Sequence, residues 1–129
     1  MKQITALAFA LLLVTGAAQA DVPPEQQPEV AHLLGFVQSS PCMINRNGTT
    51  HQGEEAAAHI RKKYEYYRKK IKTTEQFIEY SATKSTMSGK YYTVLCEGRE
   101  PVKAKDWLVN ELETYREKKD DPRYASQPR

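Results

Sequence analysis

The stretch Tyr91–Cys96, with the sequence YYTVLC, decides the fold of this chain. Its residues are mostly aromatic or β-branched, and glycines stand on both sides, a combination that predicts a β-strand. Because successive side chains of a strand point to opposite faces, Tyr92, Val94 and Cys96 share one face. A single strand cannot form a sheet, so a partner strand must lie elsewhere in the chain.

The best partner is the short segment Cys42–Arg46, with the sequence CMINR. A disulfide between Cys42 and Cys96 would place the two strands side by side and close a loop of about 55 residues, which stabilises a fold by about 4 kcal/mol in the chain-entropy model. We favour a structural bridge over redox or metal chemistry. No C-x-x-C motif is present, and a zinc site would need further soft ligands.

The residues after this strand predict a turn that leads into a helix. Asn47-Gly48 is a strong turn signal, but Thr49–Glu55 (TTHQGEE) resembles a return strand only poorly. The sequence therefore favours two strands in all, with no hairpin at this turn.

About four helices are predicted around the two strands. They are expected to begin at Pro28, near Gly53, after the capping residue Thr73 and at Asp106. Two short strands need helices to cover them. The sequence therefore predicts a small α+β domain with one disulfide.

The first twenty residues have the pattern of a secretory signal peptide. Lys2 precedes the apolar run Ile4–Val14, and Ala18-Gln19-Ala20 is a cleavage signal. The run is short for a membrane span, and no second apolar segment of sufficient length follows. We therefore expect cleavage after Ala20 and a periplasmic or secreted protein.

The remaining chain divides into three parts. Residues 21–27 are expected to be a flexible lead-in, 28–117 a single domain and 118–129 a disordered tail. The net charge of the whole chain is only +3, far from the charge of a dedicated nucleic-acid binder. We therefore expect no nucleic-acid partner.

Arg46 and the loop Ser85–Gly89 form the most interesting pair of polar features. If the two strands are antiparallel, Arg46 lies near the start of the second strand, beside this loop. A guanidinium next to serines and free backbone N–H groups can clasp a carboxylate or phosphate. Alternatively, Arg46 only satisfies loop carbonyls.

A second constellation is the evenly spaced set His51, Glu55 and His59. On one continuous helix these side chains would share a face and could hold zinc or copper. However, His51 is expected before the helix begins, and the spacing matches no known zinc-enzyme motif. In the structural interpretation His51 supports the turn and Glu55 pairs with His59. We predict no metal and no cofactor.

Two further patterns favour ordinary interpretations. Arg61–Lys72 (RKKYEYYRKKIK) could bind lipopolysaccharide, anionic lipid or nucleic acid, but it also fits a solvated helix face. Ser81–Lys84 matches the S-x-x-K motif of penicillin-recognising enzymes. The partner motifs S-D-N and K-T-G are missing, so we interpret this match as coincidence.

Several short motifs together resemble the YfeK-like family of small bacterial periplasmic proteins, a domain of unknown function. They are Arg46-Asn47-Gly48 with His51 and His59, Thr74–Ile78, Ser85–Gly89, Tyr92-Thr93-Val94 and Trp107-Leu108. The resemblance spans roughly residues 33–116 and implies a Gram-negative envelope setting without an assigned activity. In that family pattern the cysteines are not universal, which implies a local staple and no shared cysteine chemistry.

These observations lead to two hypotheses. The first is a non-enzymatic module that binds an envelope partner or an anionic envelope ligand; its candidate ligand-binding residues are Arg46, Asn47, His51, His59, Ser85, Ser88 and Gly89. The alternative is a small metal-dependent or hydrolytic periplasmic enzyme that uses His51, Glu55 and His59. The ligand, the partner and the oligomeric state are not predicted.

Overall fold

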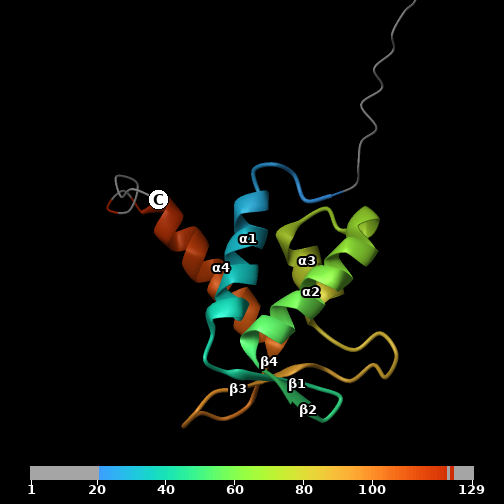
Figure 1. Ribbon diagram of the computed structural model, residues 1–129. Coiled ribbons are helices and arrows are strands. Elements are labelled where there is room, and N and C mark those ends of the chain that lie inside the picture. Colours follow the sequence, from blue (N-terminus) through green and yellow to red (C-terminus); the bar gives the residue numbers. More distant parts are fainter. Residues whose placement is uncertain (1–20, 122, 124–129) are drawn as a thin grey trace, which may run out of the picture.

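The computed structural model describes residues 21–121 and residue 123, so the expected signal peptide lies outside the described residues. The α-helices are α1 (Gln27–Ser39), α2 (Gly53–Tyr67), α3 (Thr74–Ala82) and α4 (Ala104–Asp120), with the short 3-10 helix η1 (Arg68–Lys70) after α2. The strands are β1 (Met43–Arg46), β2 (Thr49–His51), β3 (Thr93–Leu95) and β4 (Val102–Lys103). The helices lie together on one side of the small sheet, which closes the lower end of the molecule in Figure 1.

The predicted pair of strands forms the centre of the sheet. The strand order is β2-β1-β3-β4, and every neighbouring pair is antiparallel. Ile44 of β1 lies opposite Val94 of β3. Next to this pair, Cys42 and Cys96 form the predicted disulfide, with their Cα atoms 4.5 Å apart. The α+β class and the bridge are confirmed, but the described part of the sheet has four strands and not two.

The first additional strand, β2, corrects the prediction of a turn without a hairpin. Asn47 and Gly48 both adopt positive φ angles, 54° and 85°. Positive φ at both central residues is the geometry of the tight hairpin turn that Asn-Gly favours. The return strand Thr49–His51 is mostly exposed and lies at the edge of the sheet, so it pairs through its backbone without an apolar pattern.

The second additional strand, β4, pairs with β3 and forms the other edge of the sheet. It contains only Val102 and Lys103, both exposed, and the helix α4 follows at once. α4 therefore begins at Ala104, two residues before the predicted start at Asp106, and the backbone N–H of Ala104 donates to the carbonyl of Tyr92.

The core lies between the inner face of the sheet and the four helices. Tyr92 and Val94 point inward from the face that they share, and Cys96 at the end of the same face is only partly buried. The largest fully buried hydrophobic side chains are Phe77, Leu33, Ile71, Ile78, Leu108, Val37 and Val94. They come from three of the helices, β3 and the segment after η1, so one continuous core holds the whole arrangement.

The break between α2 and α3 lies at the predicted capping residue Thr73. The Thr73 hydroxyl accepts a hydrogen bond from the Gln76 backbone N–H at 3.1 Å. Gln76 reaches back with its side-chain carbonyl to the backbone N–H of Lys72 at 2.8 Å. Ile71 is fully buried at the break, which fixes the direction in which α3 leaves.

An ion pair between the buried Glu29 and the partly exposed Arg116 joins three of the helices. Arg116 of α4 donates from Nε and from one terminal nitrogen to Glu29 of α1, at 2.6 and 3.0 Å. Thr74 of α3 donates to the same carboxylate at 2.7 Å. The hydrogen bonds from the Arg116 guanidinium lower the pKa of Glu29 below its ordinary value. Burial of the carboxylate acts in the opposite direction, but its effect on the pKa is smaller. Glu29 is therefore charged at neutral pH and ties α1, α3 and α4 together.

The described residues extend beyond the expected domain 28–117 at both ends. Val22, within the expected lead-in, is buried in the core. α4 continues to Asp120, and residues 122 and 124–129 of the expected tail lie outside the described residues. Among the residues that the structure covers, no helix has both the length and the apolar character needed to cross a membrane.

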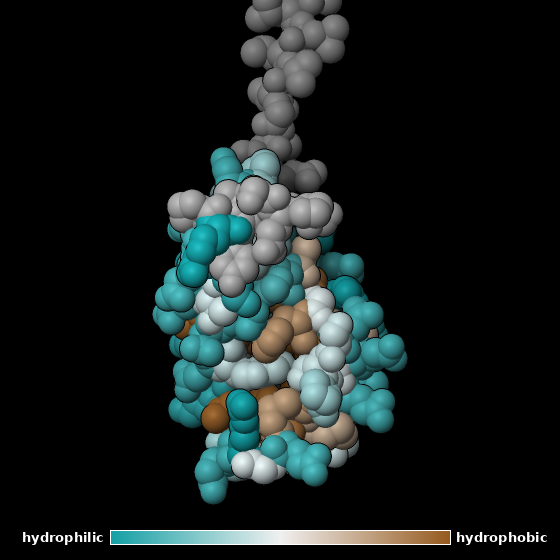
Figure 2. All heavy atoms as spheres, turned by 90° about the vertical axis from the view of Figure 1, so that its left-hand side faces the viewer, coloured by the Kyte–Doolittle hydropathy of each residue, from teal (hydrophilic) through white to brown (hydrophobic). Residues whose placement is uncertain are grey.

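One open hollow, of about 540 Å³, lies beside the disulfide. Phe36 of α1 packs on Trp107 of α4 in this hollow, with 4.6 Å between the ring centres. Figure 2 shows the side of the molecule that carries α4, where hydrophobic residues emerge between hydrophilic ones toward the lower end.

Candidate functional site

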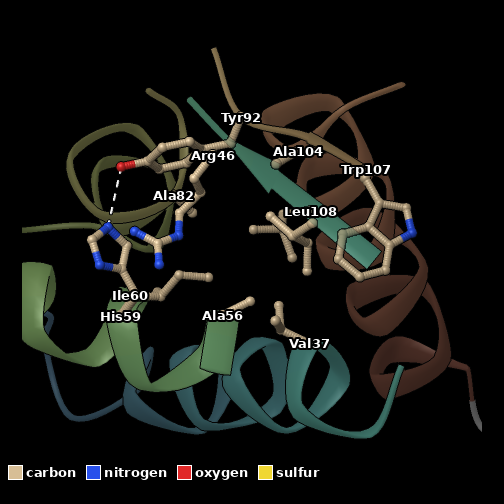
Figure 3. Close-up of a pocket in the computed structure, with 11 residues that line it drawn as sticks. Val37, Arg46, Ala56, His59, Ile60, Ala82, Tyr92, Ala104, Trp107 and Leu108 are labelled. Carbon is tan, nitrogen blue, oxygen red and sulfur yellow. Dashed lines mark hydrogen bonds between the residues drawn. The ribbon is translucent and has the colours of Figure 1, made fainter. Parts of the chain in front are cut away.

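Arg46 is a charged residue whose side chain the fold turns toward the interior. It lies two positions after Ile44 on β1, so the alternation of the strand directs it to the inner, helix-covered face. In Figure 3 its guanidinium points between Tyr92 and His59. The Nε atom is buried and has no hydrogen-bond acceptor in the described part of the chain. Buried donors are normally paired, so Arg46 retains binding capacity.

Three polar side chains surround this guanidinium. Nε2 of His59 lies 3.2 Å from the Tyr92 hydroxyl, and the Lys63 ammonium donates to the same hydroxyl at 3.3 Å. Lys63 also donates to the backbone carbonyl of Lys84 at 2.7 Å. Neutral His59 can accept the Tyr92 proton while the Tyr92 oxygen accepts from Lys63. The cluster thus joins α2 to the segment before β3.

The environment of the cluster disfavours additional positive charge. Burial first, and then the charges of Arg46 and Lys63, lower the pKa of His59 from 6.5 to about 4. Burial and Arg46 also lower the pKa of Lys63, and burial raises the pKa of the Tyr92 hydroxyl. At neutral pH His59 and Tyr92 are therefore neutral, while Arg46 remains charged.

The cluster forms the floor of an open groove of about 550 Å³ between α2, the β1–β2 turn and the loop at 85–87. The cations that line it are Arg46, Lys62 and Lys63. Among the described residues, no carboxylate lines the groove. The enclosed space behind Arg46 measures only about 10 Å³, so a ligand could approach the guanidinium only from the groove.

The predicted residues Asn47, Ser85 and Ser88 do come together, but with one another. The Asn47 side chain donates to the Ser85 hydroxyl at 3.3 Å and accepts from the Ser88 hydroxyl at 2.6 Å. This small network fastens the β1–β2 turn to the loop. Its hydroxyls are used internally, so we assign it to positioning the groove.

Three of the backbone N–H groups in the serine loop, those of Ser85, Ser88 and Gly89, are hydrogen-bonded within the chain. The N–H of Ser85 donates to the carbonyl of Lys90, and that of Gly89 donates to the carbonyl of Ser85. The N–H of Ser88 donates to the Ser85 hydroxyl. Gly89 has a φ of 71°, which closes the loop on itself, and it lines a neighbouring hollow. The cations that an anion in the groove would meet are the side chains of Arg46, Lys62 and Lys63.

His51 takes part in a different contact from the one proposed. Its Nδ1 lies 3.1 Å from a carboxylate oxygen of Glu55, so Glu55 pairs with His51 and not with His59. The described residues contain no group of three or more histidine, cysteine, aspartate or glutamate side chains placed to hold a metal ion. The proposed ligand set His51, Glu55 and His59 is thus not assembled in this structure.

The remaining sequence motifs divide between core and surface. Ser81 is fully buried in α3, while Lys84 is exposed, so the S-x-x-K match does not form an accessible pair. The sequence analysis interprets Lys63 as part of a solvated face and places Tyr92 on a strand face without a role in the site. In the structure Tyr92 lies one position beyond the register pair Asn45–Thr93, which sets it across from Arg46.

Comparison with known proteins identifies the family. The chain is 39% identical over 93 residues to the uncharacterized protein YfeK of Salmonella typhimurium, covering 71% of this chain and 77% of that protein. No solved structure shows significant similarity to the chain. Residues 24–116 match the model of the family of unknown function DUF5329. The chain belongs to this family, in agreement with the resemblance seen in its motifs.

Proposed function

We propose that this protein is a non-enzymatic module that binds an anionic group in the groove beside Arg46. The observation that carries the proposal is the Arg46 guanidinium, whose buried Nε has no acceptor among the described residues and which lies beside other cations. Arginine presents several N–H donors in a planar fork that matches carboxylate and phosphate.

The electrostatics of the groove support the same conclusion. Arg46, Lys62 and Lys63 lie together, and Arg46 lowers the pKa of both Lys63 and His59. Uncompensated like charges in a partly buried site raise the free energy of the folded protein. A bound anion would remove this repulsion. His59 and Tyr92 would then offer hydrogen-bonding groups on the groove floor.

We further propose that this binding takes place in the periplasm. The disulfide Cys42–Cys96 is compatible with an oxidising compartment, where such bonds persist. The signal-peptide pattern of the first twenty residues points to the same compartment. An anionic constituent of the cell envelope is therefore the ligand class that we assign.

The proposal is tested by titrating the purified protein with inorganic phosphate, with ionic strength held constant by chloride. The variant Arg46→Gln removes the guanidinium, and we expect it to weaken phosphate binding about tenfold or more, as for the loss of a hydrogen bond to a charged group. The matched control is Arg99→Gln, an exposed arginine outside the groove. It should bind phosphate like the original protein.

The melting temperature and far-ultraviolet spectrum of each variant establish that it is folded. A folded Arg46→Gln variant that binds phosphate with unchanged affinity contradicts the proposal. Absence of phosphate binding by the unmodified protein contradicts it as well.

A further inference from the structure

We infer that the groove docks the protein onto the surface of an anionic phospholipid membrane, an inference that rests on the proposed function. It concerns the source of the anionic group, which we assign to lipid head groups. Apolar side chains stand at the rim of the groove, where a small bound anion would not cover them.

Two large apolar side chains at this rim are almost completely exposed. Met87, in the loop beside the groove, is 99% exposed, and Tyr66 of α2 is 81% exposed. Both line the groove with the cations Arg46, Lys62 and Lys63. We take these two apolar side chains and the neighbouring cations together as one interaction surface.

The chemistry of this rim matches the layers of a lipid surface. A flexible methionine can enter the outer part of the acyl region, and tyrosine is favoured at the level of the head groups, where its ring is buried and its hydroxyl stays wet. Lysine and arginine near the surface attract anionic lipids. The groove therefore presents charge where the phosphates lie and apolar groups where the membrane interior begins.

A dissolved small anion fits these observations less well. It would contact the floor around Arg46 and leave the outward-pointing Met87 in water. A lipid surface is broad enough to touch the floor and the rim at once. Charge complementarity and the two exposed side chains thus favour a membrane over a soluble metabolite.

The test is sedimentation of the purified protein with vesicles. One set contains phosphatidylglycerol mixed with phosphatidylcholine, and the other contains phosphatidylcholine alone. We expect binding to the anionic vesicles that weakens as salt increases, and little binding to the neutral ones. Arg46→Gln and Met87→Ser should each reduce the bound fraction severalfold. The matched control is Val102→Ser, which removes an exposed apolar residue of β4 outside the groove.

The outcomes separate this inference from the proposed function. Arg46-dependent binding of inorganic phosphate without binding to anionic vesicles overturns the membrane inference and leaves the proposed function standing. Vesicle binding that is unchanged by Met87→Ser, or equal for both vesicle types, also overturns it. If neither phosphate nor anionic vesicles bind, both the inference and the proposed function are wrong.

Discussion

Gly53 is the position where the absence of a side chain matters most for the fold. It is buried at the start of α2, where this helix meets the end of α1. A Cβ atom at Gly53 would lie 2.3 Å from the carbonyl oxygen of Val37, a distance that the backbone cannot accept without moving. Only glycine lets the two helices approach so closely, and their contact sets the position of the lysines on α2.

We therefore expect Gly53→Ala to lower the free energy of unfolding by about 1–3 kcal/mol, as overpacking of a tight interior does. The matched control is Gly35→Ala in α1, where a new Cβ would meet nothing within 4 Å. That substitution should raise the free energy of unfolding by about 0.5–1 kcal/mol, because alanine favours helix. Urea denaturation measures both. Equal effects would show that the close approach is unimportant.

A role for Arg46 could be proposed from the sequence, but the direction of its side chain could not be predicted. Its place next to a turn predicted a role in anion binding, and the structure brings it beside His59 as well. Its inward direction depends on which face of β1 the helices cover. That face is set by the pairing of Ile44 with Val94, a contact between distant parts of the chain.

Among the elements, the helices were more predictable than the strands. Apolar residues at helical spacing, a proline near the start of α1 and the Thr73 cap all act within a few residues. The edge strands β2 and β4 are two or three residues long and mostly exposed, so they carry no apolar alternation. Their pairing depends on the neighbouring strand, which local patterns cannot reveal.

The bridge between Cys42 and Cys96 holds the two central strands together across a sequence separation of 54 residues. Closing so long a loop restricts the unfolded chain, and we expect reduction to lower the free energy of unfolding by about 4 kcal/mol. Thermal unfolding with and without reductant measures this effect, and the double variant Cys42→Ser/Cys96→Ser should reproduce it. An unchanged melting temperature after complete reduction, verified by intact mass, would contradict the expectation.

The groove as a whole arises from parts that are distant in sequence: the β1–β2 turn, the stretch 59–67 of α2, the loop after α3 and Tyr92. Local reasoning found Arg46, His59 and Ser85, but assigned Lys63 to a solvated face. Lys63 reaches its partners because α2 crosses close to the residues at 84 and 92. The arrangement of the helices therefore decides which lysines of the basic segment belong to the site.

His59 makes the stability of the folded protein depend on pH. The charged and titratable groups around it are Arg46 of β1, His51 of β2, Lys62 and Lys63 of α2, and Tyr92. An unfolded histidine takes up a proton below about pH 6.5, but the folded protein does so only near pH 4. The unfolded state thus binds more protons in this window, so stability should fall as the pH drops from 6.5 to 4.

An anion bound beside Arg46 would reverse part of this effect, because it favours the protonated form of His59. The most direct measurement is therefore an NMR titration of the His59 ring in sulfate and in chloride at equal ionic strength. Sulfate keeps its charge throughout this range. His32, which contacts Glu111 away from the groove, is the internal control.

We predict that sulfate raises the pKa of His59 by about one unit or more from its value of about 4, and that Arg46→Gln abolishes this rise. The His32 ring should not respond to sulfate. If the His59 titration is the same in sulfate and chloride, no anion binds beside Arg46 and the central claim is wrong.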